Sequence, residues 1–160
     1  MGLHPKIKTL DELVFLAEKL KTEGKKIVLS HGDFDLIRYG HLHYLEESKK
    51  LGDVLIVSVV ADEFVRKGPE KPIFDESTRA HLIALLECVD YIVICQYFGP
   101  WGIIEKLKPD VYTKDERASV QLNNPHSGVS RDKATIESVG GIFVLTKTIS
   151  SSSTDVLDGY

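Results

Sequence analysis

The sequence predicts an α/β fold, a single domain built on a doubly wound, five-stranded parallel sheet. Short apolar runs alternate with helix-like segments along the whole chain. The run 53–60 is almost continuously apolar, as in strands that are buried on both faces of a parallel sheet. A glycine-bearing turn at 32–41 follows the first strand-like run and leads into a helix. Right-handed crossovers between such strands place helices on both faces of an open sheet.

Each element has its own local signal. Thr9 is a suitable N-cap for the first helix and Gly24 a suitable stop; Asp75 and Ser130 are N-cap candidates, and Pro100 fits a first helical turn. Strands are expected at residues 26–30, 53–60, 91–95, 110–113 and 142–145. Helices are expected at residues 9–24, 40–52, 75–87, 100–107 and 130–141, with a polar stretch before Gly128 and a last helix opening at 150–154.

Composition limits the function classes. With 160 residues and 42% hydrophobic content, the chain is expected to form one domain over 1–160. A net charge of −4 gives no reason to expect binding to a nucleic acid or an anionic membrane. Cys88 and Cys95 lie in apolar surroundings, which favours reduced thiols. No signal peptide or membrane-spanning run is present, so we expect a soluble cytoplasmic protein.

The turn between residues 32 and 41 carries the strongest functional signal. At a helix start the backbone N–H groups are unpaired and the helix dipole favours negative charge, so such a turn can bind phosphate. Neither a Walker loop nor a dinucleotide fingerprint occurs in the chain. Ligands of doubly wound sheets bind beyond the carboxyl ends of the strands. The loops after Ser30, Val60, Thr113 and Leu145 are therefore expected to meet at one site.

The block Gly32–His41 resembles the G-x-F-D-x-x-H-x-G-H signature of the cytidylyltransferase-like nucleotidyltransferases. Residues 61–64 are similar to the family's S-T-D-E-F, and residues 149–154 to its G-I-S-T-T. Across a core of about 25–157, preceded by the helix at about 9–24, the chain looks most like the glycerol-3-phosphate cytidylyltransferase and heptose-1-phosphate adenylyltransferase branch. The resemblance implies a Rossmann-like sheet of the nucleotidyltransferase type.

The resemblance also implies a reaction and its residues. A phosphate oxygen of a small phosphorylated sugar or polyol would attack the α-phosphorus of CTP or ATP, and pyrophosphate would leave, with Mg²⁺ brought by the triphosphate. The expected catalytic residues are His41, Arg38, Lys67 and Arg79. The expected nucleotide-binding residues are Gly32, Asp33, Phe34, Gly40, His41, Lys114, Ser152, Ser153 and Thr154. The expected substrate-binding residues are Asp62, Lys71 and Lys147.

Two departures from the family pattern bear on activity. Arg38 stands where the family has the first histidine of its H-x-G-H motif. Arginine can bind phosphate through its planar donor fork, but it does not titrate near neutral pH. After the fourth strand this chain reads Lys114-Asp115-Glu116-Arg117, without the glycine of the family's M-G-D-D or K-G-x-D-Y. That loop helps to hold nucleotide or sugar in the family.

Several alternatives stay open on the sequence. Arg38 leaves room for a nucleotide-binding module with weakened catalysis and a regulatory or assembly role. A stress-protein-like nucleotide binder fits the fold, but the residue pattern of the block 32–41 argues against it. A zinc site from His31, His41 and His43 is disfavoured, because positions 41 and 43 point in different directions on a helix. No protein-held metal is therefore expected, and the resemblance further implies a homodimer and a fused or partner sugar-kinase domain.

Overall fold

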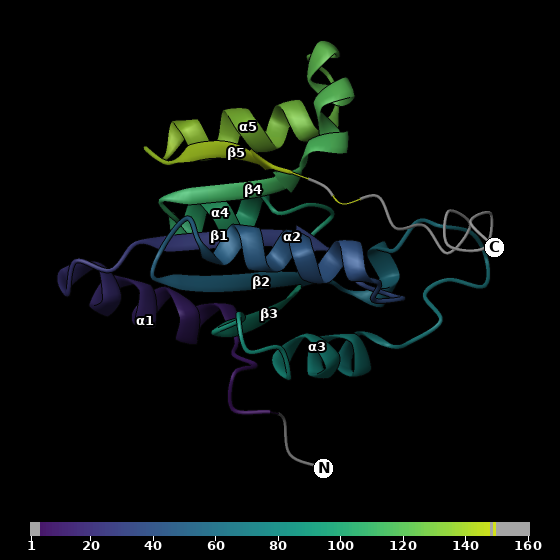
Figure 1. Cartoon of the computed structure of the whole chain (residues 1–160), viewed down its shortest axis with the longest axis horizontal. Coiled ribbons are helices and arrows are strands. Elements are labelled where there is room, and N and C mark those ends of the chain that lie inside the picture. Colours follow the sequence, from purple (N-terminus) through teal and green to yellow (C-terminus); the bar gives the residue numbers. More distant parts are fainter. Residues whose placement is uncertain (1–3, 148, 150–160) are drawn as a thin grey trace.

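The computed structural model describes residues 4–147 and 149. Five parallel strands form one sheet in the order β3-β2-β1-β4-β5, which confirms the predicted doubly wound α/β fold (Figure 1). The strands are β1 (Ile27–Gly32), β2 (Val54–Val60), β3 (Tyr91–Cys95), β4 (Val111–Asp115) and β5 (Ile142–Thr146). The helices are α1 (Leu10–Thr22), α2 (Tyr39–Lys49), α3 (Glu76–Ala84), α4 (Trp101–Leu107) and α5 (Gly128–Ser138), with 3₁₀ segments η1 (Asp62–Phe64) and η2 (Glu116–Asn123).

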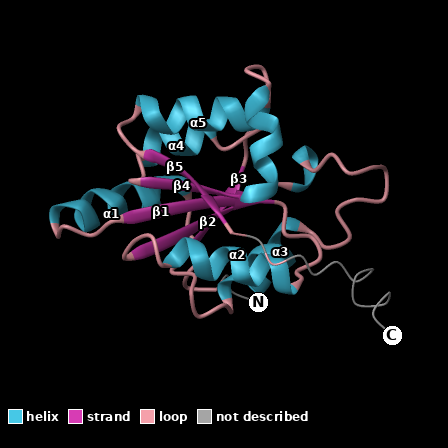
Figure 2. Cartoon of the chain, turned by 45° about the horizontal axis from the view of Figure 1, so that its top comes forward, coloured by secondary structure: helices cyan, strands magenta, loops and turns pink. Residues whose placement is uncertain are grey.

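Each face of the sheet carries its own apolar layer. Ile27 and Leu29 of β1 pack in a cluster with residues of α1, α4 and α5. Val28, between them, packs in the opposite cluster with Leu45 of α2 and Ile83 of α3. Figure 2 shows α2 and α3 below the sheet and α4 and α5 above it. Because successive strand residues point to opposite faces, a strand covered on both sides must be apolar at nearly every position.

Two predicted helix caps are confirmed. The Thr9 hydroxyl accepts the N–H of Glu12 at 3.2 Å, and the Glu12 carboxylate accepts the N–H of Thr9 at 2.7 Å. This reciprocal pair fixes the first turn of α1. At α3 the Asp75 carboxylate accepts the N–H of Thr78 at 2.7 Å. Both caps satisfy backbone donors that a helix start leaves unpaired.

Two local predictions are wrong. α5 is capped by Ser127, whose hydroxyl accepts the N–H of Ser130 at 3.1 Å, so the helix begins before the residue that was expected to cap it. α3 ends at Ala84, three residues short of the expected Glu87. The polar stretch expected before Gly128 contains η2, a 3₁₀ segment that the sequence did not indicate; the Asp115 carboxylate caps it by accepting the N–H of Arg117 at 2.9 Å.

The winding of the sheet reverses between β1 and β4. β1 pairs with β2 on one side and with β4 on the other, so loops after β1 and β4 diverge at this point. Beneath it the Thr113 hydroxyl lies 2.7 Å from that of Ser30 and 2.9 Å from that of Ser48. The Tyr44 hydroxyl donates to the Thr113 carbonyl at 2.8 Å. This buried network ties β1 and β4 to the middle and the last turn of α2 and so holds that helix against the sheet at the switch point.

Both cysteines are free thiols in the structure. Cys95 is buried and Cys88 is partly buried. Burial raises the pKa of both thiols, which disfavours their reactive thiolate forms. Over residues 4–147 and 149, no helix combines the length and the apolar character that crossing a membrane requires.

Candidate active site

A hollow of about 210 Å³ opens at the switch point, beyond the carboxyl ends of β1 and β4. Six residues expected to bind nucleotide line it, and four further residues complete its wall. The six are Gly32, Asp33, Phe34, Gly40, His41 and Lys114, and the four are His31, Tyr44, Asp115 and Arg117. The motif and the loop at 114–117 therefore pointed to this hollow, but the 3₁₀ segment η2 that carries Arg117 was not expected, and Arg117 was not among the expected site residues.

The turn after β1 has an unusual backbone. Phe34 has a φ of 51°, in the left-handed region that residues with a side chain rarely adopt. Its ring is nevertheless buried and meets the His41 ring edge-on, with centroids 6.0 Å apart. A Cβ on Gly32 would lie 3.1 Å from this ring, which is a tight contact, so glycine at position 32 makes room for the ring. Such strain is held in place by the surrounding packing and is concentrated at functional sites.

His41 is oriented by the backbone of Arg38. The Arg38 N–H donates to His41 Nδ1 at 3.1 Å, so this nitrogen is an acceptor. The neutral ring must then carry its proton on Nε2, where it can be donated. Burial lowers the pKa of His41, and the nearby charges of Arg38, Lys67 and Arg117 lower it further. At neutral pH the site thus holds an uncharged imidazole, and within the described part of the chain its Nε2–H has no recorded hydrogen-bond acceptor.

A second hollow, of about 410 Å³, adjoins the first and shares Phe34 and His41 with it. Its other lining residues are Asp35, Leu36, Arg38, Lys67 and Lys71. Three of these are cations, so this chamber suits an anionic group. The Lys67 ammonium lies 2.9 Å from the Asp33 carboxylate. Although burial alone would raise it, this ion pair holds the pKa of Asp33 below its ordinary value.

Arg79 and Asp62 do not line either hollow. The Arg79 side chain is fully buried, and its guanidinium donates to the Phe74 carbonyl at 2.9 Å and to the Asp33 carbonyl at 2.6 Å. Its third partner is the Asp62 carboxylate at 2.7 Å. The expected free cation is thus occupied by protein acceptors. Arg79 thus connects three segments: the turn after β1 through Asp33, the start of the long β2–α3 loop through Asp62, and the end of that loop through Phe74.

Asp35 is the aspartate of the G-x-F-D signature, but the sequence did not indicate what it does in the site. Its carboxylate accepts the N–H groups of Ile73 and Phe74, each at 2.9 Å, and its residue is only 7% exposed. Burial raises the pKa of Asp35, but these backbone donors and the charges of Lys71 and Arg79 outweigh burial and lower it. Asp35 therefore fastens the loop that carries the two lysines to the turn after β1.

The remaining predicted residues are only partly placed. Lys114 lies at the wall of the first hollow, with its ammonium 3.7 Å from the buried Asp132 carboxylate. Lys147 is exposed just beyond β5 and lines neither hollow. The serines and threonine expected to bind nucleotide lie outside the described residues, as does the helix expected at 150–154: Ser152, Ser153 and Thr154.

The histidines considered for zinc do not form a metal cluster. Within the described part of the chain, no group of three or more His, Cys, Asp or Glu side chains could hold an ion. His31 instead has Nδ1 3.0 Å from the Ser58 hydroxyl. Burial, with a further effect of Lys114, lowers the pKa of His31 to about 3, so its ring is neutral. A neutral His31 adds no positive charge to the hollow that it lines.

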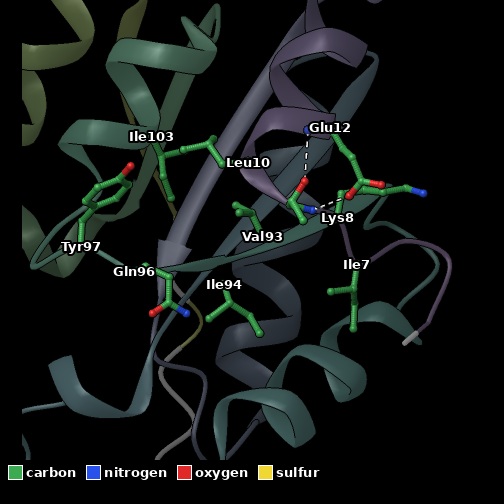
Figure 3. A pocket seen from close by; sticks show the side chains of 10 residues that line it. Ile7, Lys8, Leu10, Glu12, Val93, Ile94, Gln96, Tyr97 and Ile103 are labelled. Carbon is green, nitrogen blue, oxygen red and sulfur yellow. Dashed lines mark hydrogen bonds between the residues drawn. The ribbon is translucent and has the colours of Figure 1, made fainter. Parts of the chain in front are cut away.

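A third hollow, of about 360 Å³, lies beside α1 and β3 (Figure 3). Ile7, Leu10, Val93, Ile94 and Ile103 give it a largely apolar wall. It shares no lining residue with the two hollows at the switch point. Such a surface lacks the convergent cations that phosphate chemistry requires.

Comparison with known proteins agrees with the fold and the motif. The sequence model of the Cytidylyltransferase-like family matches residues 29–158. The bifunctional protein HldE of Geobacter metallireducens is 40% identical over 156 residues, which cover 96% of this chain but 30% of that protein. HldE of Aliarcobacter butzleri is 46% identical over 110 residues, 68% of this chain and 23% of that protein. The chain thus spans less than a third of these curated relatives.

Solved structures show the same architecture. A lipopolysaccharide core biosynthesis protein from Thermoplasma volcanium superposes with a TM-score of 0.63 at 30% identity, covering 81% of this chain and all of that one. A pantoate-beta-alanine ligase from Francisella tularensis reaches a TM-score of 0.65 over 92% of this chain and 68% of that one; at 14% identity it shows the fold alone. With its motif at the switch point and a family match over most of its length, the chain belongs to the cytidylyltransferase-like family of nucleotidyltransferases.

Proposed function

We propose that this domain transfers a nucleoside monophosphate from ATP or CTP to a small phosphorylated sugar or polyol and releases pyrophosphate. The observation that carries the proposal is the position of neutral His41. It borders both the hollow formed by the signature turn and the chamber lined by three cations. A donor shared by two adjoining anion-binding spaces is what a reaction between two phosphates requires.

The reaction follows from that arrangement. A phosphate oxygen of the acceptor attacks the α-phosphorus, a new P–O bond forms, and the bond from the α-phosphorus to the bridging oxygen breaks. Pyrophosphate leaves with the electron pair, and no covalent enzyme intermediate is needed. Charge grows on the phosphoryl oxygens in the transition state, so fixed donors and cations lower the barrier. His41 Nε2–H and the Arg38 guanidinium are our candidates for this role.

The two hollows divide the substrates between them. The triphosphate is assigned to the hollow of Gly32, Phe34 and Gly40, where α2 begins. The phosphate of the acceptor is assigned to the cationic chamber, with Lys67 and Lys71 as its partners. Mg²⁺ would be held chiefly by triphosphate oxygens and water, which it prefers, because the described residues offer no cluster of protein ligands.

The other predicted residues take supporting parts. Arg79 and Asp62 act as positioning residues that hold the turn and the lysine loop in register. Lys147, Ser152, Ser153 and Thr154 remain candidates for phosphate contacts at the end of the domain. The resemblance to the heptose-1-phosphate adenylyltransferase branch and the HldE relatives favours ATP and a sugar phosphate. The greater length of those relatives supports pairing with a sugar-kinase domain, and the family pattern supports a homodimer.

The test is a pyrophosphate-release assay on the purified chain. ATP or CTP with Mg²⁺ is combined with a panel of phosphorylated sugars and polyols, and His41→Ala serves as the matched inactive variant. We expect one nucleotide and acceptor pair to give pyrophosphate that depends on both substrates and on His41. If the chain binds nucleotide but no pair gives pyrophosphate, the proposal fails, and the module with weakened catalysis becomes the better interpretation.

A further inference from the structure

The segment after β4 brings two cations to the first hollow, and they differ in what already holds them. Lys114 has a side chain that is 23% exposed, with its ammonium 3.7 Å from the Asp132 carboxylate and over the Tyr112 ring at 5.9 Å. Asp132 is 3% exposed, and the Tyr112 hydroxyl also donates to it at 2.9 Å. The charge of Lys114 is therefore drawn toward the interior of the domain.

Arg117 has the opposite situation. Its side chain is 69% exposed, and it lines the same hollow as Gly32 and His41. Its Nε lies 2.8 Å and its Nη2 3.2 Å from the two oxygens of the Asp115 carboxylate. The same carboxylate accepts the Arg117 N–H at 2.9 Å. The Asp115 carboxylate thus holds Arg117 at both its backbone N–H and its guanidinium.

The pairing leaves Arg117 able to take a ligand. The fork contacts with Asp115 use Nε and Nη2, so further N–H groups of the guanidinium remain for an anion. An exposed ion pair contributes little to stability, whereas a guanidinium forms strong, oriented bonds with phosphate. The positive charge of Arg117 also reaches His41, whose pKa it helps to lower.

We propose that Arg117 is a phosphate-binding residue of the nucleotide site, and that it supplies the solvent-accessible cation of the β4–α5 connection, whereas Lys114 is drawn toward Asp132. The inference rests on the proposed function. Its ligand is the polyphosphate part of a nucleotide, not the nucleoside. The wild-type chain is expected to bind nucleoside weakly and to gain affinity as phosphates are added, and Arg117 is expected to supply a distinct share of that gain.

The test is a ligand series measured by isothermal titration calorimetry on wild type, Arg117→Gln and Arg117→Lys. The ligands are adenosine, AMP, ADP and ATP, or the cytidine series if CTP binds better, with Mg²⁺ present. We expect Arg117→Gln to weaken triphosphate binding about tenfold or more and to leave nucleoside binding unchanged. Arg117→Lys should recover part of the loss, because it keeps the charge but not the fork.

Lys133→Gln is the matched control. Lys133 is an exposed cation of α5 that pairs with Glu137 at 3.9 Å and lines none of the three hollows. It should bind every ligand like wild type, and thermal melts of all variants check the fold. The proposal is overturned if Arg117→Gln binds triphosphate like wild type, or if it loses nucleoside affinity to the same extent. If wild type binds triphosphate without making pyrophosphate, only the proposed function fails.

Discussion

The ring of His31 gives a prediction whose size follows from the structure. This histidine is the penultimate residue of β1 and lines the hollow at the switch point, with Nδ1 3.0 Å from the Ser58 hydroxyl. Burial and the charge of Lys114 lower its pKa from 6.5 to about 3. In the unfolded chain the same ring is exposed and has its ordinary pKa. Folding therefore excludes a proton that the unfolded chain takes up in mildly acidic solution.

The sign and the magnitude follow by linkage. Because the folded pKa is the lower one, the contribution of His31 to stability is complete above the ordinary pKa and is lost as pH falls toward about 3. Between the two values the free energy of unfolding drops by at most about 1.4 kcal/mol per pH unit. From about pH 7 to about pH 5.5 the expected loss from this one ring is therefore roughly 1.3 kcal/mol.

Urea denaturation at these two pH values measures the loss. His31→Gln removes the titrating ring and keeps a group that can bond to Ser58. Wild type should lose about 1.3 kcal/mol more stability on acidification than His31→Gln does. His126→Gln, at an exposed loop position, is the control and should follow wild type. If wild type and His31→Gln lose the same amount, the ring is not excluded from protonation and the reasoning is refuted.

Three further predictions concern residues that line or support the two hollows at the switch point. His41→Ala should lower kcat by about 10²–10³ in the pyrophosphate assay with little loss of fold; an early melt with normal turnover would indicate a structural role instead. Arg38→Ala should lower kcat far more than it weakens nucleotide binding if arginine stabilises the transition state, and identical rates for Arg38→Ala, Arg38→His and wild type would contradict any role. Asp35→Asn should cost about 1–3 kcal/mol in urea denaturation, because backbone donors of Ile73 and Phe74 lose carboxylate acceptors; an unchanged midpoint would count against the clamp.

The fold and the central hollow could be predicted because their signals are local. A doubly covered strand such as β2 is recognisable by its apolar run alone. The signature turn is one continuous block of sequence, so Gly32, Phe34 and His41 could be placed together at this hollow from the motif alone. Strand ends were less accurate: β1 continues to Gly32 because His31 and Gly32 still pair with β2.

The parts that were missed depend on partners far away in the sequence. Nothing near Asp35 indicates that it accepts the N–H groups of Ile73 and Phe74, which lie on the far side of a long loop. From the sequence Arg79 is expected to be a cation of a helix. In the folded chain its side chain is completely buried, and its guanidinium donates to acceptors of Asp33, Asp62 and Phe74. Burial of a charge requires such a set of partners, and the set exists only in the folded chain.

Arginine at position 38, in place of the family's histidine, is compatible with the catalytic arrangement proposed above. What orients His41 is the backbone N–H of residue 38, which any amino acid except proline supplies. The side chain at this position is therefore free to change without disturbing the His41 tautomer. A guanidinium there adds a permanent charge beside Lys67 and Lys71, and it adds to the effect of burial in lowering the pKa of His41, which favours the neutral imidazole. Phosphoryl transfer needs positive charge placed beside the reacting phosphate, and it does not need a second group that titrates. Arginine at position 38 can supply that charge.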